Sequence, residues 1–93
     1  MEIKTERTAE QYYVKAAAEA VTWTDDLAKA NYPDGWAVNA AREKVYAGRL
    51  LHALAHKHGE TWEQARERLA AKVEARVKRE RRENEKVAAQ YAR

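Results

Sequence analysis

The chain has 93 residues, of which 20 are alanine, 18 are lysine or arginine and 15 are aspartate or glutamate, and its formal net charge is +3. It has one proline, three glycines and no cysteine, which excludes a disulfide scaffold, a cysteine-ligated metal site, a thiol nucleophile and a Pro/Gly-rich disordered chain. No apolar run approaches the roughly 20 residues that span a bilayer, and residues 1–10 lack the apolar core of a signal peptide. We therefore expect one soluble, cytoplasmic helical domain over residues 1–93, without a membrane partner.

The first helix is predicted over about residues 9–30. Thr8 and Gln11 have the spacing of a capping box, in which the hydroxyl accepts from the third amide and the amide side chain reaches back. An Asn-Tyr-Pro-Asp-Gly turn at residues 31–35 ends the helix. A kink after Thr22, with a new helix starting in the following Thr-Asp-Asp, stays open as an alternative.

Two further helices are predicted over about residues 36–58 and 62–92. Gly59 follows the first of them, where glycine commonly adopts the left-handed conformation that ends a helix. Thr61 and Gln64 form a second capping box. No Pro or Gly follows, so the last helix can be about 45 Å long. From about residue 78 onward we expect it to project from the body or to fray.

The helix over 36–58 is apolar on two nearly opposite sides. Its bulky strip consists of Trp36, Ala40, Ala47, Leu50, Leu51 and Leu54. Its small strip consists of Val38, Ala41, Val45, Gly48 and Ala55, with His52 on the same side. A helix apolar on both sides is normally sandwiched, so we expect it to be central, with the other two helices or a second subunit against its faces. The predicted fold is all-α, a three-helix bundle whose long, charged C-terminal helix extends beyond the body, and a homodimer would enlarge its small core.

Two further expectations concern the packing around Gly48 and the burial of the three tryptophans. A glycine inside a helix costs about 1 kcal/mol relative to alanine, and a close backbone approach at Gly48 would explain it. Trp23, Trp36 and Trp62 each fall on a predicted apolar strip, so we expect all three in the core.

The C-terminal helix carries an apolar seam with acid on one flank and base on the other. Residues 61–93 hold ten bases and six acids, whereas residues 1–60 hold eight bases and nine acids. The seam comprises Trp62, Ala65, Leu69, Ala70, Val73, Val77, Glu80, Asn84, Val87, Ala88 and Tyr91. The acidic flank comprises Glu63, Glu67, Glu74 and Glu85. The basic flank, called the basic stripe below, includes Arg68, Lys72, Arg76, Arg79, Arg82 and Lys86.

Three interpretations of the basic stripe stay open. It is typical of a solvated helix with i,i+4 ion pairs, of a helix that docks on a protein, and of a track of phosphate contacts. Interspersed glutamates, and the lack of a polar cluster that could read base edges, count against nucleic acid. An apolar seam between oppositely charged flanks favours a partner helix, with Asn84 fixing the register and Glu80 pairing across it.

The histidines and the exposed side of the helix over 36–58 offer two smaller candidates. His52 and His56 stand at i,i+4, as in helical zinc sites, but the glutamate of a metalloprotease motif is absent. We therefore predict surface histidines and no metal. Tyr46 lies between Arg42 and Arg49 on the polar side of its helix, and Tyr and Arg are frequent in interface hot spots, so these three are a candidate contact patch.

These observations predict a non-enzymatic, protein-binding module that regulates or inhibits a larger assembly through its C-terminal helix. The alternative is a nucleic-acid-associated protein that contacts phosphates through the basic stripe. An enzyme is not expected, because the chain has no serine, no cysteine and no glycine-rich phosphate loop. No cofactor is expected either. The short, cysteine-free helical chain also suits an accessory protein of a phage or mobile element.

Overall fold

In a computed structural model, the chain is described over residues 5–91, with side chains described over residues 9–90. This part is all-α, as predicted, and measures about 50 × 28 × 25 Å. None of its helices combines the length and the apolar character that crossing a membrane requires. The elements are α1 (Thr5–Thr22), α2 (Asp26–Asn31), α3 (Trp36–His58) and α4 (Trp62–Tyr91).

The region predicted as one helix over residues 9–30 is two helices. α1 ends at Thr22, and the next amides bond in turns: Thr24 N donates to Val21 O at 3.1 Å and Asp25 N to Thr22 O at 3.1 Å. The Thr24 hydroxyl also donates to Val21 O at 2.6 Å, an alternative to continuing the helix that threonine readily offers. The single-helix prediction is therefore wrong, and the alternative of a break after Thr22 is confirmed.

The start of α1 also differs from the prediction. The helix begins at Thr5, so Thr8 lies inside its first turns rather than at its cap. The predicted hydrogen bonds of the Thr8 side chain lie outside the described side chains. The backbone position alone shows that Thr8 is not the capping residue.

The loop between α3 and α4 is built as predicted. Gly59 has φ 64° and ψ 34°, and the amides of Gly59 and Glu60 donate to the carbonyls of His56 and Ala55 at 3.2 and 2.9 Å. These two bonds satisfy carbonyls that the end of a helix leaves unpaired. At the start of α4, Gln64 N donates to the Thr61 hydroxyl at 3.1 Å and Thr61 N donates to the Gln64 side chain at 2.9 Å. Both caps are confirmed.

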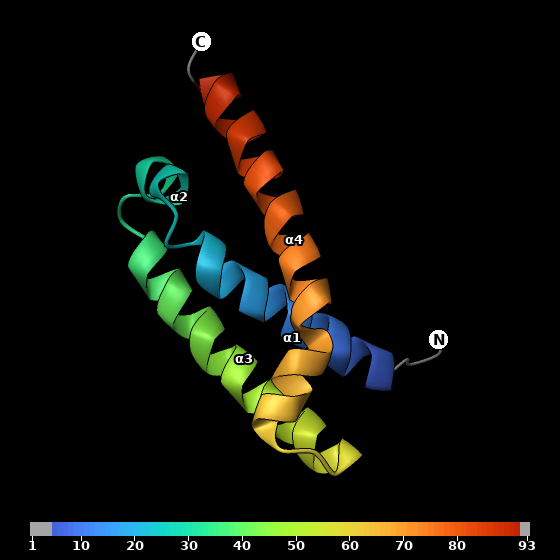
Figure 1. Cartoon of the computed structure of the whole chain (residues 1–93). Coiled ribbons are helices and arrows are strands. Elements are labelled where there is room, and N and C mark those ends of the chain that lie inside the picture. The colour runs from blue at the N-terminus through green and yellow to red at the C-terminus, as the bar shows by residue number, and fades with distance from the viewer. Residues whose placement is uncertain (1–4, 92–93) are drawn as a thin grey trace.

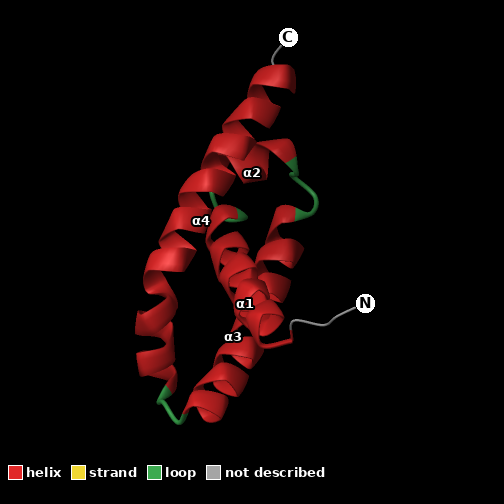
Figure 2. Ribbon diagram, turned by 90° about the vertical axis from the view of Figure 1, so that its right-hand side faces the viewer, coloured by secondary structure: helices red, strands yellow, loops and turns green. Residues whose placement is uncertain are grey.

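The central helix is α1 and not α3. α1 packs extensively on α3 and also on α4, whereas α3 and α4 touch much less and diverge from the loop that joins them (Figures 1 and 2). Ala16 and Ala18 are both fully buried although about 200° separates them around the helix, so α1 is covered on two sides. Small alanines let a neighbouring helix approach closely on each side. The main core contains Tyr13, Ala16, Ala47, Leu51, Leu54, Ala55, Ala65 and Leu69.

Because α1 takes the central place, most of the small strip of α3 stays uncovered. Val38 and Val45 are 65% and 55% exposed. Apart from its chain neighbours and the backbone of its own helix, no heavy atom lies within 4 Å of the position that a Cβ on Gly48 would occupy, so the predicted close approach at this glycine is wrong. Of the strip, Ala55 is buried.

The tryptophans divide between two environments. Trp23 and Trp36 are half-buried: the ring of Trp23 meets Tyr32 edge-on at 5.3 Å, and Lys29 lies 4.5 Å from the centre of the Trp36 ring. Trp62 is 42% exposed, and none of the three tryptophans belongs to the buried core, so the prediction that places all three there is wrong. It is the first residue of α4, where the helix has just left the loop.

Candidate functional site

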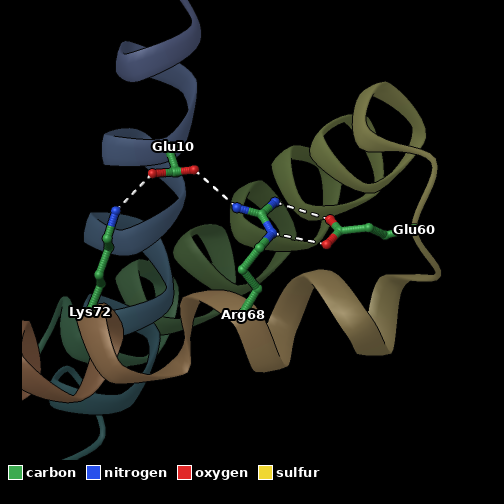
Figure 3. Close-up of polar contacts among 4 residues, drawn as sticks. All are labelled: Glu10, Glu60, Arg68 and Lys72. Atoms are coloured by element: carbon green, nitrogen blue, oxygen red, sulfur yellow. Dashed lines mark hydrogen bonds and ion pairs between the residues drawn. The ribbon is translucent and has the colours of Figure 1, made fainter.

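The first two cations of the basic stripe are held by acids of the same chain (Figure 3). Arg68 donates through Nε and Nη2 to both oxygens of Glu60, at 2.9 and 3.0 Å, and through Nη1 to Glu10 at 3.2 Å. Lys72 donates to the other oxygen of Glu10 at 3.0 Å. The four residues join α1, the α3–α4 loop and α4. Both cations therefore have a structural role in this fold.

These ion pairs lower the pKa of both carboxyl groups, Glu10 and Glu60. The hydrogen bond from Lys72 lowers the pKa of Glu10; partial burial opposes this, and Arg68 adds to the lowering. The hydrogen bond from Arg68 likewise lowers the pKa of Glu60. Glu60 in turn makes the largest contribution to raising the pKa of Arg68. The charged forms are thus favoured on both sides of each ion pair.

The next cation of the stripe, Arg76, belongs to a second internal cluster. Its Nε donates to Glu80 at 2.9 Å, and the buried Thr22 hydroxyl donates to the other Glu80 oxygen at 3.0 Å. One turn further, Arg81 donates to both oxygens of Asp25 at 2.8 and 3.2 Å, which raises the pKa of Arg81. Glu80, which the sequence suggested could pair with a partner helix, is thus occupied within the chain. Its bond to Arg76 has the local i,i+4 spacing, whereas its bond to Thr22 spans 58 positions and could not be found from local spacing.

The last three cations of the stripe have a different environment. Arg79, Arg82 and Lys86 are exposed, and no ion pair joins them to other described side chains. Arg79 and Arg82 border a shallow groove of about 460 Å³ between α1 and α4, called the basic groove. Its lining consists of Glu10, Gln11, Val14, Lys72, Ala75, Arg76, Arg79 and Arg82. The six predicted contact residues therefore divide into three cations that pair with acids of the same chain and three that do not pair with a described acid.

Between α1, α3 and α4 lies a second groove that the sequence did not predict. This apolar groove has a volume of about 500 Å³. Its lining consists of Tyr13, Ala17, Ala20, Val21, Lys44, Ala47, Arg66, Ala70, Val73, Glu74, Val77 and Arg81. Burial raises the pKa of Tyr13, with the charge of Arg66 acting in the opposite direction. Ala70 and Val77 lie on the predicted seam of α4. The sequence placed α3 at the centre, with the other two helices or a second subunit against its faces, and this arrangement does not contain the groove.

The predicted contact patch on α3 is assembled on the exposed side of that helix. Arg42, Tyr46 and Arg49 line one shallow depression, and all three are exposed. Arg42 donates to the Asn39 side chain at 2.6 Å. The patch adjoins the uncovered Val45, so a homodimer through this face stays a prediction.

The predicted histidine pair lies on the surface of α3. His52 and His56 are exposed on successive turns. Among the side chains described over residues 9–90, no three or more of His, Asp or Glu gather where they could hold a metal ion. Neither histidine lines the basic groove, the apolar groove or the depression beside Tyr46.

Comparison with known proteins adds no assignment to this geometry. No model of a known protein family matches the chain, and neither a curated protein nor a solved structure is significantly similar to it. What is known of the chain is its all-α structure, with four described helices. Function therefore has to be inferred from the grooves and exposed charges described above.

Proposed function

We propose that the chain is a non-enzymatic protein-binding module that docks a partner along α4 and thereby regulates or inhibits a larger assembly. The observation that carries this proposal is the apolar groove. Val21 on its floor is 42% exposed, and Ala70 on its α4 wall is also exposed. Apolar side chains that line a groove and stay accessible are typical of protein-interaction sites.

The length of α4 supports the same proposal. At 30 residues it is the longest described helix, and its distal turns add surface beyond the corner where Arg81 meets Asp25. In this proposal those distal turns extend the docking surface past the packed body. The cytoplasm as its setting, and an accessory role in a phage or mobile element, are parts of the proposal that rest on composition alone.

A photo-crosslinking pair tests the function. Ala70 and Ala71 are adjacent, exposed alanines on α4, but only Ala70 lines the apolar groove. A photoreactive amino acid at position 70 should form a covalent adduct with a discrete polypeptide in a cell extract, and the same probe at position 71 should not. Equal adduct patterns from both positions, or none from position 70, would reject docking through this groove.

The second candidate function is nucleic-acid binding, which the outward-facing Arg79, Arg82 and Lys86 favour. These cations are exposed and are not neutralised by acids among the described side chains. Cations on one flank of a helix can contact successive phosphates without reading sequence. In this alternative the contact set is smaller than the full basic stripe, because Arg68, Lys72 and Arg76 already have partners.

A salt titration with matched charge variants tests this alternative. The slope of log affinity against log salt changes by about 0.9 for each lost phosphate contact on duplex DNA. The variant Arg79→Ala/Arg82→Ala should therefore flatten the slope by about two units. The variant Arg42→Ala/Arg49→Ala removes the same formal charge from α3 and should leave the slope as it was. Similar slopes for the two variants would eliminate α4 as the phosphate track.

A further inference from the structure

The shape of the apolar groove indicates what can occupy it. α1 forms the floor with Ala17, Ala20 and Val21, α4 forms the long wall, and α3 contributes Ala47. The lining residues of α4 run from Arg66 to Arg81, which is about 22 Å along a helix. A segment that fills this length as a helix needs about 15 residues, or four turns.

The walls of the groove favour a helix over an extended strand. They are themselves helices, whose backbone amides and carbonyls are already paired, so a strand entering the groove would find no edge with which to pair. A helix satisfies its own backbone and needs only an apolar face. The small side chains at positions 17, 20, 47 and 70 permit the short axial distances at which helices pack.

The charges around the groove indicate which charged residues should flank the apolar face of a bound helix. Lys44 on α3 and Arg66 on α4 are exposed, and neither forms an ion pair with another described side chain. Arg81 is neutralised by Asp25, and Glu74 is the one acid of the lining. The rim therefore presents an excess of positive charge from two different walls.

We propose that the apolar groove binds an amphipathic helix of a partner protein, about four turns long, whose apolar face is flanked by carboxylates that pair with Lys44 and Arg66. This inference rests on the proposed protein-binding function and adds the chemistry of the partner. A second copy of this chain fits less well. The exposed Val45 on α3 of such a copy is bordered by Arg42 and Arg49, which would place like charges beside Lys44 and Arg66.

The test uses two labelled synthetic helices of sixteen residues with the same apolar face, one flanked by glutamates and the other by lysines. Fluorescence anisotropy should show the glutamate helix binding about tenfold or more tightly than the lysine helix. Reversal of the rim charges in Lys44→Glu/Arg66→Glu should remove or invert this preference. Preference for the lysine helix by the unmodified chain, or equal binding of both, would overturn the proposal.

A matched pair of groove variants locates the binding site. Ala70→Glu places bulk and negative charge inside the groove and should weaken the glutamate helix about tenfold or more. Ala71→Glu makes the same change one residue away, outside the groove, and should leave the affinity unaltered. Circular dichroism of both variants confirms the helical fold, so that weaker binding by Ala70→Glu cannot be assigned to unfolding. Equal effects of the two substitutions would contradict the assignment.

Two further outcomes separate this inference from the function on which it rests. If a probe at position 70 captures a protein while the glutamate helix shows no advantage, the partner chemistry is wrong and the protein-binding function stands. If light scattering shows a dimer that Ala70→Glu dissociates and Ala71→Glu does not, a second copy fills the groove and the acidic partner is rejected.

Discussion

Gly48 is a residue at which the chain loses stability without a compensating contact. It lies in the middle of α3, and the space where its Cβ would stand is open to 4 Å. Glycine in a helix interior is less favourable than alanine because it loses more backbone freedom on folding. Nothing in the described packing compensates for this cost.

The substitution Gly48→Ala should therefore raise the free energy of unfolding by about 0.5–1 kcal/mol. Gly59→Ala is the matched control, because Gly59 has a φ of 64° that alanine adopts only with strain, and this variant should be less stable than the parent chain. Urea unfolding followed by circular dichroism measures both. Destabilisation by Gly48→Ala would mean that a partner or a second chain packs against that face of α3 in solution.

At this scale, the sequence predicted local features well and burial less well. The cap formed by Thr61 and Gln64, and the turn at Gly59, depend on residues only a few positions apart, so their spacing is informative. Whether Trp62 or Gly48 is covered depends on helices that arrive from elsewhere in the chain. The structure leaves Trp62 partly exposed and Gly48 without close neighbours at its Cβ position.

At the scale of the elements, the most informative feature is the link that Arg68 makes among three of them. It bonds Glu60 in the loop and Glu10 on α1 from its own position on α4. Both carboxyl groups have a pKa below the usual value of 4.5 in the folded chain. A lowered folded-state pKa stabilises the fold above the pKa of the unfolded chain, and this stabilisation is lost as the pH falls through the folded value.

The substitution Arg68→Gln should consequently destabilise the chain at neutral pH, and its effect should shrink below about pH 4. Protonated Glu10 and Glu60 lose most of their attraction to the guanidinium, so the parent chain and the variant converge in acid. Chemical unfolding across this pH range is the measurement. A constant stability difference down to about pH 3 would show that Arg68 acts through packing rather than charge.

The order of the helices in space was harder to infer than their faces. The seam of α4 was predicted correctly at Ala65 and Leu69, which are both buried. Periodicity identifies an apolar face but does not say which helix covers it. α3, with apolar residues on two sides, is the better candidate for the centre from sequence alone. α1 occupies that place instead, because its small residues Ala16 and Ala18 permit close packing on two sides.

At the scale of the whole molecule, α4 separates two surfaces of different chemistry. On one side the basic groove leaves Arg79 and Arg82 exposed, and on the other the apolar groove leaves Val21 and Ala70 exposed. The sequence identified the basic stripe but not the single acid, Glu10, that lies 58 positions from Arg68 and 62 from Lys72 and holds both. The apolar groove depends on three helices at once, so no pattern within one helix could reveal it.

The most direct test of protein binding through the apolar groove is a ¹⁵N-edited NMR titration of the chain with the glutamate-flanked helix. The amides of Val21, Ala70 and Val77 should shift progressively, while those of Val38 and Val45 on the outer face of α3 should stay in place. Shifts confined to the outer face of α3, or to Arg79 and Arg82 in the basic groove, would contradict the assignment of the apolar groove as the docking site.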